Sequence, residues 1–179
     1  MNRKSFLAAA AATLALSLGL GAAPQASATQ PTPANNIVDV AIAVNSSGPY
    51  AGLFDTLITA VLAADPAVLK RLTSKGQSTV FAPTDDAFGA LGLTPDNVGN
   101  LPQAALTEIL LYHVLPGRRD SNDVLASTRL RTLQGAFLKQ ASGTLTDVLE
   151  RQANIIVVDV PASNGVIHAI DAVVLPFAP

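Results

Sequence analysis

The chain has 179 residues, 49% of them hydrophobic and 13% charged, which is enough apolar material for the core of one domain and too little charge for a disordered chain. The formal net charge is −2, so the clustered basic surface that a nucleic-acid partner needs is not expected. The sequence contains no cysteine, and this excludes disulfides, thiol catalysis and zinc–thiolate sites.

The first 28 residues have the pattern of a secretory signal peptide. Arg3 and Lys4 precede an apolar run over residues 6–20, and Ala26 and Ala28 form the small-x-small site that signal peptidase accepts. The apolar run is shorter than the ~20 residues that a membrane-spanning helix needs. We therefore expect an exported protein with no membrane span after cleavage, located in the medium, in the periplasm or on the cell surface.

Residues 29–35 form a polar, proline-containing linker, and a helical region is expected after it. Asn35 or Asn36 can cap the first helix, and Asp65 followed by Pro66 can begin the third. Apolar residues recur at helical spacing in three stretches, residues 37–44, 53–62 and 66–72. We place one domain at residues 36–176, with its first third helical, and leave residues 177–179 as a short tail.

The middle of the chain combines a strand with short helices. Residues 78–82 are β-branched and aromatic, as in a strand, and Thr84 can cap a helical turn that begins with Asp85 and Asp86. A further helix is expected from Pro102 until shortly before Pro116 and Gly117. Ser121 can then cap a brief helix over residues 123–126.

The last third has the character of strands joined by turns. Asn164 and Gly165 tolerate positive φ and lie between two β-branched runs, which predicts a hairpin turn. By the two-residue period, His168 shares one strand face with Val166, and Asp171 shares the other face with Ile167. The predicted strands are residues 129–133, 137–140, 145–149, 155–160 and 166–175. Helices first and hairpins last indicate an α+β fold.

Three segments of the chain carry a joint signature: T-V-F-A-P-T-D-D-A-F at residues 79–88, L-Y-H-V-L-P-G at 111–117 and S-N-G-V-I-H-A-I-D-A-V-V-L-P at 163–176. Their order and spacing resemble those of fasciclin-like, or FAS1, domains, and the resemblance covers nearly all of residues 36–176. It implies two β-sheets that form a wedge, with helices packed along an edge. It also implies a secreted or surface-anchored protein that supports cell adhesion and matrix or biofilm association.

The resemblance also implies candidate partner-binding residues. In the family, the pair at Tyr112 and His113 is implicated in integrin-type adhesion. Asp159 and Val160 stand where animal members carry an Asp-Ile pair with a similar role, with valine here in place of isoleucine. A structural interpretation of Tyr112 and His113 stays open, in which they end a helix, pack on the core and hydrogen-bond through their polar tips.

The remaining motif residues have a structural interpretation. Thr84 and Asp85 suit a strand-to-helix junction, where the helix dipole favours negative charge. Asn164 and Gly165 suit the hairpin turn described above, and Asp171 lies on one face of the strand that follows it. A lone histidine on an apolar face, such as His168, is typical of a core residue whose ring nitrogens find polar partners nearby.

Catalysis is not expected. The sequence lacks a G-x-S-x-G elbow, a phosphate-binding glycine loop and the H-E-x-x-H spacing of zinc hydrolases. Residues 120–123 are acidic but lack the glycine and the terminal glutamate of a calcium loop. We therefore expect no cofactor and no metal.

Two functional hypotheses follow. The first is an extracellular adhesion module that binds a protein or polysaccharide through an exposed apolar patch with a polar rim; weak self-association stays open. The second is a secreted carrier that holds a small apolar ligand in a pocket between helices and sheets. An exposed apolar patch over a closed core favours adhesion, whereas an open apolar cavity of several hundred Å³ favours the carrier.

Overall fold

The computed structural model describes residues 35–177. The predicted signal peptide, most of the predicted linker and the last two residues lie outside this range. The helices are α1 (Ile37–Ser46), α2 (Asp55–Ala63), α3 (Pro66–Thr73), α4 (Asp85–Gly89), the 3-10 helix η1 (Val98–Asn100), α5 (Gln103–Tyr112) and α6 (Ser121–Ala126). The strands are β1 (Ser78–Pro83), β2 (Val114–Pro116), β3 (Arg129–Arg131), β4 (Phe137–Ala141), β5 (Thr144–Thr146), β6 (Gln152–Ala162) and β7 (Gly165–Ile170).

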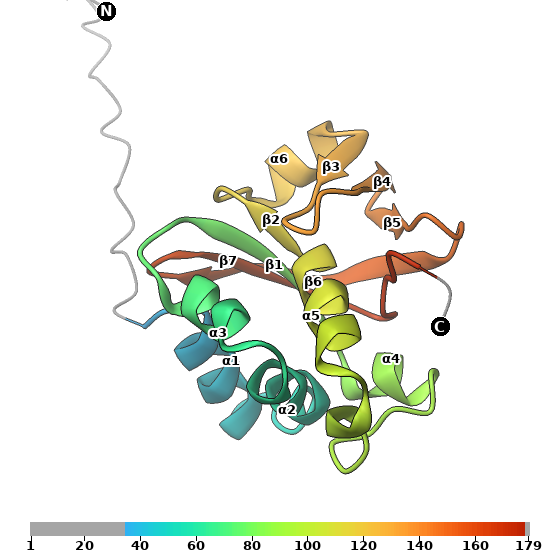
Figure 1. Ribbon diagram of the computed structural model, residues 1–179. Coiled ribbons are helices and arrows are strands. Elements are labelled where there is room, and N and C mark those ends of the chain that lie inside the picture. The colour runs from blue at the N-terminus through green and yellow to red at the C-terminus, as the bar shows by residue number, and fades with distance from the viewer. Residues whose placement is uncertain (1–34, 178–179) are drawn as a thin grey trace, which may run out of the picture. The chain divides into compact units, whose positions relative to one another are not determined.

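The seven strands form one continuous order, β2-β1-β7-β6-β5-β4-β3, in which β1 and β7 are parallel and the other neighbours are antiparallel. The long strand β6 belongs to both halves of this order. Its residues 152–154 pair with β5, and its residues 155–162 pair with β7. Figure 1 shows β3, β4 and β5 with α6 at one end of the molecule and α1, α2 and α3 at the other, with β1 and β7 between them. The two predicted sheets are thus joined through β6.

The strands β1 and β7 are buried on both faces because each face meets a separate core. All six residues of each strand are buried. On one face, Val80 and Ile167 pack into a core with the helices α1, α2, α3 and α5. On the other face, Phe81 and Ile170 pack into a core with the strands β3, β4 and β5. The predicted alternation along β7 therefore separates the residues of two cores.

Helix N-termini follow the predicted capping chemistry. Asn36 forms a capping box with Asp39 at the start of α1, and Asp65 caps α3 ahead of Pro66. Thr84 caps α4 by accepting the Ala87 amide. At α6 the prediction was wrong by one residue, because the cap is Asp120, whose carboxylate accepts the Asp123 amide.

Several strand boundaries differ from the predictions. The strand β7 ends at Ile170, where β1 also ends, and the predicted continuation to residue 175 is wrong. Its apolar alternation continues because Val174 still packs in one core and Leu175 in the other. The short strand β2 was not predicted, because three residues after a helix leave too little pattern. No helix within residues 35–177 combines the length and the apolar character needed to cross a bilayer.

The turn between β6 and β7 exists, but the predicted reason for it was wrong. Ser163 and Asn164 form a two-residue connection between the paired Ala162 and Gly165. Neither Asn164 nor Gly165 has a positive φ. Glycine is required because a Cβ at position 165 would overlap the carbonyl oxygen of Ser78 and lie 2.8 Å from Ile37 Cδ1. Close approach of two backbones, and not a left-handed conformation, therefore selects this glycine.

Candidate functional site

Tyr112 is the last residue of α5, and its side chain is fully buried. Its hydroxyl donates to the Phe137 carbonyl oxygen at 3.1 Å and so connects α5 to the start of β4. Two effects raise the pKa of the Tyr112 hydroxyl to about 12: burial, which is the larger, and the nearby negative charge of Asp147. The phenol is therefore neutral at physiological pH and acts as an internal donor.

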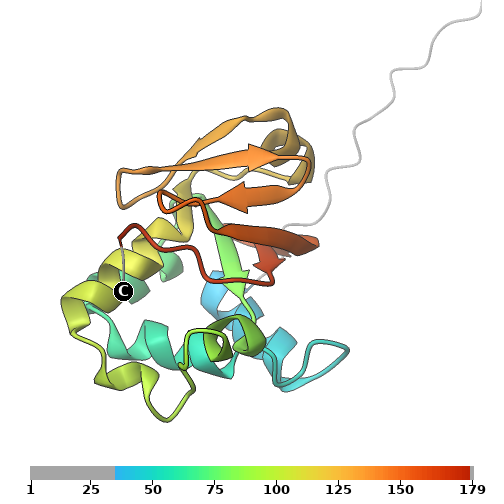
Figure 2. The same cartoon turned by 90° about the vertical axis from the view of Figure 1, so that its right-hand side faces the viewer.

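His113 follows Tyr112 as the C-cap of α5, and its side chain is only 2% exposed. Its Nδ1 lies 2.8 Å from the Ile109 carbonyl oxygen, and its Nε2 accepts the Val174 amide at 3.2 Å. These contacts require a proton on Nδ1 and none on Nε2, so the ring is neutral. Burial lowers the pKa of His113 to about 4, which keeps it neutral. The ring thus ties the end of α5 to the segment after β7, which Figure 2 shows running back across the molecule.

Asp159 and Val160 lie on β6, away from Tyr112 and His113. The pairing of β6 with β7 is interrupted twice, between Ile155 and Val157 and between Val157 and Val160. Asp159 lies in the second interruption with a φ of 59°, which is uncommon for a residue other than glycine. Its exposed carboxylate accepts the Ser121 amide at 2.8 Å and the Ser121 hydroxyl. Val160 is half-buried and packs against the helical core.

His168 lies in the middle of β7 and is fully buried. Its Nδ1 accepts the Asp159 amide at 3.2 Å, and its Nε2 lies 3.0 Å from the Arg119 carbonyl oxygen. Its ring also lies beside the Phe81 ring, with 5.8 Å between the centroids. Both ring nitrogens are therefore occupied by backbone groups, and one of these contacts holds the bulge of β6 at Asp159.

An open cavity of about 260 Å³ lies beside this bulge, between α6, the β4–β5 turn and β6. Leu125 and Val158 line it and are about half exposed, and the Ser121–Asp159 pair forms a polar edge. We define the α6–β6 surface as Ser121, Leu125, Val158 and Asp159. The sequence pattern did not single out Leu125 or Val158, because exposed leucine and valine leave no distinctive signal.

The polar groups near this cavity are not arranged for acyl transfer. The Ser121 hydroxyl donates to Asp159, whereas an activated serine would face a histidine. Both nitrogens of His168 are engaged with the backbone, so the ring has no free nitrogen to serve as a base. Within residues 35–177, no three histidine, aspartate or glutamate side chains gather as they would around a metal ion. The polar groups at this cavity therefore already have partners within the protein.

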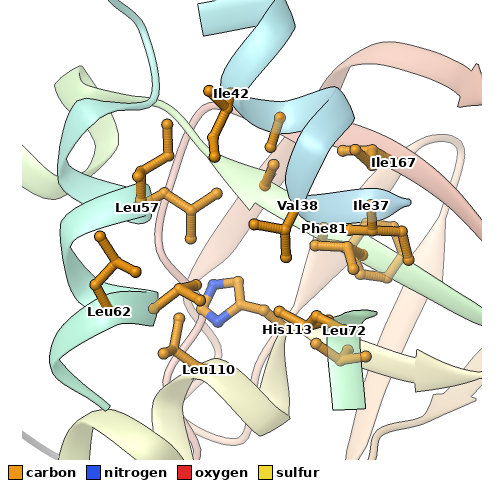
Figure 3. Close-up of a pocket in the computed structure, with 16 residues that line it drawn as sticks. Ile37, Val38, Ile42, Leu57, Leu62, Leu72, Phe81, Leu110, His113 and Ile167 are labelled. Atoms are coloured by element: carbon orange, nitrogen blue, oxygen red, sulfur yellow. The ribbon is translucent and has the colours of Figure 1, made fainter. Parts of the chain in front are cut away.

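Two smaller apolar cavities lie beneath α1. The first has about 70 Å³ of free space and is lined by residues of α1, α2, α5 and the strands β1 and β7 (Figure 3). The second has about 30 Å³ and is lined by Ala41, Tyr50 and Phe54 together with residues of β6 and β7. Ala41, Leu57, Ala82 and Ile167 line both cavities.

Comparison with known proteins identifies the domain. The model of the fasciclin domain family matches residues 52–176. The chain belongs to the fasciclin family. It is 42% identical over 132 residues to protein sll1483 of Synechocystis, covering 69% of this chain and 67% of that protein.

Two further relatives extend the comparison. The chain is 35% identical over 125 residues to the transforming growth factor-beta-induced protein ig-h3 of Sus scrofa, covering 69% of this chain but only 18% of ig-h3. The solved FAS1 domain pair of the insect cell adhesion molecule fasciclin I has a TM-score of 0.60 and 17% identity, covering 80% of this chain and 51% of that chain. This likeness shows the FAS1 fold.

The other motif residues of this fasciclin domain act as internal connectors. Asp85 is in the first turn of α4, but its carboxylate accepts the Thr56 amide at 2.8 Å and the Asp55 amide at 3.2 Å. It thereby caps α2, which has no cap of its own. Asp171 accepts the Asn154 amide and its side-chain amide at 2.7 and 2.9 Å, which fixes the end of β7 to β6.

Asn164 connects three segments that are distant in the sequence. Its side chain is 3% exposed and accepts the Ile37 amide at 2.8 Å. Its amide group donates to the carbonyl oxygens of Leu72 and Ser74, both at 2.7 Å. The residue thus fixes the start of α1 and the end of α3 to the β6–β7 turn.

Asp147 is a buried residue of this fasciclin domain that sequence reasoning missed. Its carboxylate is paired with Arg151 at 2.8 Å and accepts the Leu149 amide at 2.8 Å and the Leu175 amide at 3.1 Å. It therefore fixes both its own turn and the C-terminal segment. A lone aspartate in a turn gives no sign of burial, so only its arginine four residues later could have hinted at this role.

Proposed function

We propose that this fasciclin domain is an exported interaction module that supports adhesion by binding an extracellular protein or polysaccharide through the α6–β6 surface. The observation that carries the proposal is the exposed aliphatic pair Leu125 and Val158 beside the polar Ser121–Asp159 pair. An apolar centre with a polar rim is the usual composition of a binding surface.

The conformation of Asp159 supports the same assignment. Asp159 has a left-handed backbone conformation on a strand whose pairing is interrupted twice, and this conformation costs free energy. Strained residues of this kind are concentrated where a fold presents groups for recognition. The Ser121 and His168 contacts hold this conformation in place. The predicted export signal agrees with an extracellular role, and the FAS1 domain pair of similar fold comes from an insect cell adhesion molecule.

Tyr112 and His113 have a different part in this proposal. Both side chains are buried, and their polar atoms contact internal backbone groups. We infer that they support adhesion by holding the fold, while the α6–β6 surface touches the partner.

The proposal is tested by attachment of the purified protein to the surface of the cells that export it. The double substitution Leu125→Ser and Val158→Ser is expected to abolish attachment and leave the melting temperature nearly unchanged, because both side chains are about half exposed. Leu91→Ser, at a leucine that is 38% exposed and outside the α6–β6 surface, is the matched control and should attach normally. Normal attachment by the double variant would refute the proposal. Treating the cells with protease or with glycosidase then separates a protein partner from a polysaccharide.

A further inference from the structure

The strands β3, β4 and β5 and the start of β6 form a sheet whose two faces differ. Leu130, Leu138 and Leu145 lie on one face and are fully buried in a core. The alternate residues lie on the opposite face, which we call the outer sheet face. We define it by five exposed residues and one half-buried residue, Thr146: Arg129, Arg131, Phe137, Lys139, Thr146 and Gln152.

The outer sheet face is positively charged in a chain whose net charge is −2. The sequence has no aspartate or glutamate between Asp123 and Asp147, a stretch that includes β3, β4 and β5. Arg129 lies opposite Lys139 in the pairing of β3 with β4. Like charges directly opposite each other destabilise a sheet. This arrangement therefore costs free energy in the isolated domain, and an anionic ligand would remove that cost.

The two arginines of this face have no acidic partner in the described part of the chain. Within residues 35–177, neither Arg129 nor Arg131 takes part in a salt bridge. The Arg129 guanidinium lies over the ring of the exposed Phe137, with 4.3 Å between its central carbon and the ring centroid. Such a cation–π contact holds the guanidinium in place, so less conformational freedom is lost when it binds a carboxylate.

The third cation of the face already binds a carboxylate. Lys139 Nζ lies 2.6 Å from Glu150 Oε1, and the two side chains are 62% and 69% exposed. An ion pair as exposed as this one usually contributes less than about 1 kcal/mol to stability. A carboxylate from a ligand can therefore replace Glu150 at Lys139 with little loss of stability.

A row of side chains crosses the four strands of this face. The strand pairing aligns one residue from each strand, in the order Arg129, Lys139, Thr146 and Gln152. Neighbouring strands are about 4.8 Å apart, so the row extends for roughly 14 Å. The strand spacing is close to the length of one sugar unit in an extended polysaccharide. A polysaccharide that lies along the row thus places successive sugars over successive strands.

The second half of the row is polar and uncharged. Within residues 35–177, neither the Thr146 nor the Gln152 side chain is hydrogen-bonded, whereas the neighbouring Thr144 hydroxyl donates to the Asn154 side chain at 2.9 Å. The free hydroxyl and amide can donate to and accept from the hydroxyl groups of a sugar. A lipid surface or a nucleic-acid backbone would use the cations of the face but has no comparable series of hydroxyl groups for this half.

We propose that the outer sheet face binds an acidic polysaccharide, a linear sugar polymer that carries carboxylate groups. Its carboxylates bind the three cations and take the place of Glu150, and its hydroxyl groups bind Thr146 and Gln152. Arginine suits this role because its planar group can donate two parallel hydrogen bonds to one carboxylate. The outer sheet face shares no residue with the α6–β6 surface, so the two proposals can fail separately.

The test is affinity electrophoresis of the purified protein in gels that contain polygalacturonate, a linear polymer of an acidic sugar, or dextran, a neutral polymer. We expect polygalacturonate alone to retard the protein, and less so as the salt concentration rises. Arg129→Gln combined with Arg131→Gln should weaken binding by at least about tenfold, because two charge-assisted contacts are lost. Lys70→Gln combined with Lys75→Gln removes the same charge from exposed positions outside the face and should bind like the parent.

A gain of binding cannot result from misfolding, so Glu150→Gln is the second variant. It removes the carboxylate that competes for Lys139 and should strengthen binding to polygalacturonate several-fold. The proposal is overturned if the parent is not retarded, if the arginine and lysine double variants bind equally, or if Glu150→Gln binds like the parent.

Two further probes and one variant separate this proposal from its alternatives. Equally strong binding to poly-L-glutamate overturns it in favour of an acidic protein segment, and equally strong binding to phosphatidylglycerol vesicles overturns it in favour of a membrane surface. Leu125→Ser combined with Val158→Ser should bind polygalacturonate like the parent. Loss of binding in that variant would place the polysaccharide at the α6–β6 surface and not at the outer sheet face.

Discussion

Tyr112 with His113, where the family resemblance predicts partner binding, and the α6–β6 surface, where we propose it, differ in exposure and in what their polar atoms contact. The first pair is buried, with 0% and 2% of its side chains exposed, and its polar atoms are taken up by backbone groups. The α6–β6 surface exposes two aliphatic side chains and a left-handed aspartate. The difference teaches that residues which identify a family can be those that the fold requires. The residues that we propose to touch a partner, Leu125 and Val158, lie outside the signature.

The buried side of this comparison depends on polar residues that connect distant segments. His113 holds Val174, Asp147 holds Leu175, and Asn164 holds the start of α1. Each accepts a backbone amide that lies at a helix start or outside the strands, and an unpaired buried amide is costly. Substitutions here should therefore change stability, and substitutions at the α6–β6 surface should change binding.

The largest effect is expected at Gly165. Gly165→Val should destabilise the domain by more than about 4 kcal/mol, because the new side chain must displace the Ser78 carbonyl and break the pairing of β1 with β7. Denaturant unfolding measures this loss. Gly89→Ala is the control, since nothing lies within 4 Å of its Cβ position, and it should be at least as stable as the parent. Equal stability of the Gly165 variant would mean that the backbones are farther apart than described.

Asp147 allows a comparison between a buried carboxylate and an exposed ion pair. Asp147→Ala should cost about 3 kcal/mol, because it leaves Arg151 without its carboxylate and the Leu175 amide without an acceptor. Lys139→Ala removes the other ion pair of this region, whose side chains are 62% and 69% exposed, and should cost less than about 0.5 kcal/mol. Unfolding of both variants in urea gives the comparison, and similar losses would contradict the buried role of Asp147.

His113 predicts a pH dependence of stability. Its pKa falls from 6.5 in the unfolded chain to about 4 in the folded domain, so the unfolded chain binds the extra proton between these values. The free energy of unfolding is therefore highest above pH 6.5. It decreases by about 3 kcal/mol as the pH falls towards 4. The free energy of unfolding measured at pH 7, 5 and 4 should therefore fall more steeply in the parent than in His113→Gln. Parallel curves would show that His113 is not buried in its neutral form.

The smallest expected difference in stability is between substitutions of the neighbouring residues Asp85 and Asp86. Asp85→Ala should cost about 1 kcal/mol, because α2 loses the acceptor for its Thr56 amide. Asp86→Ala is exposed and should change the thermal midpoint very little. If the two variants melt alike, the capping of α2 by α4 contributes nothing to stability.

Much of the fold follows from local pattern. The capping residues Asn36, Asp65 and Thr84 act as predicted because capping depends only on neighbours in the chain. The alternation along β7 is correct for the same reason, since the two-residue period is a property of the strand itself. The fasciclin signature adds the arrangement of these elements, and the family comparison confirms it.

What the pattern could not show are contacts between residues far apart in sequence. Asp85 looked like a capping residue of its own helix, and only the packing of α4 against α2 places its carboxylate at Thr56. Gly165 looked like a turn residue, and only the parallel pairing of β7 with β1 brings it against Ser78. Likewise, Leu125 and Val158 become a surface only after α6 packs beside the bulge of β6.

The most direct measurement compares attachment and melting temperature in two variants at a temperature where both are folded. Tyr112→Phe removes the hydroxyl that donates to Phe137 and should lower stability by about 1 kcal/mol while attachment persists. Val158→Ser should keep the melting temperature and lose most of the attachment. If instead the phenylalanine variant melts normally but no longer attaches, while the serine variant attaches like the parent, the assignment of buried support and exposed contact is reversed.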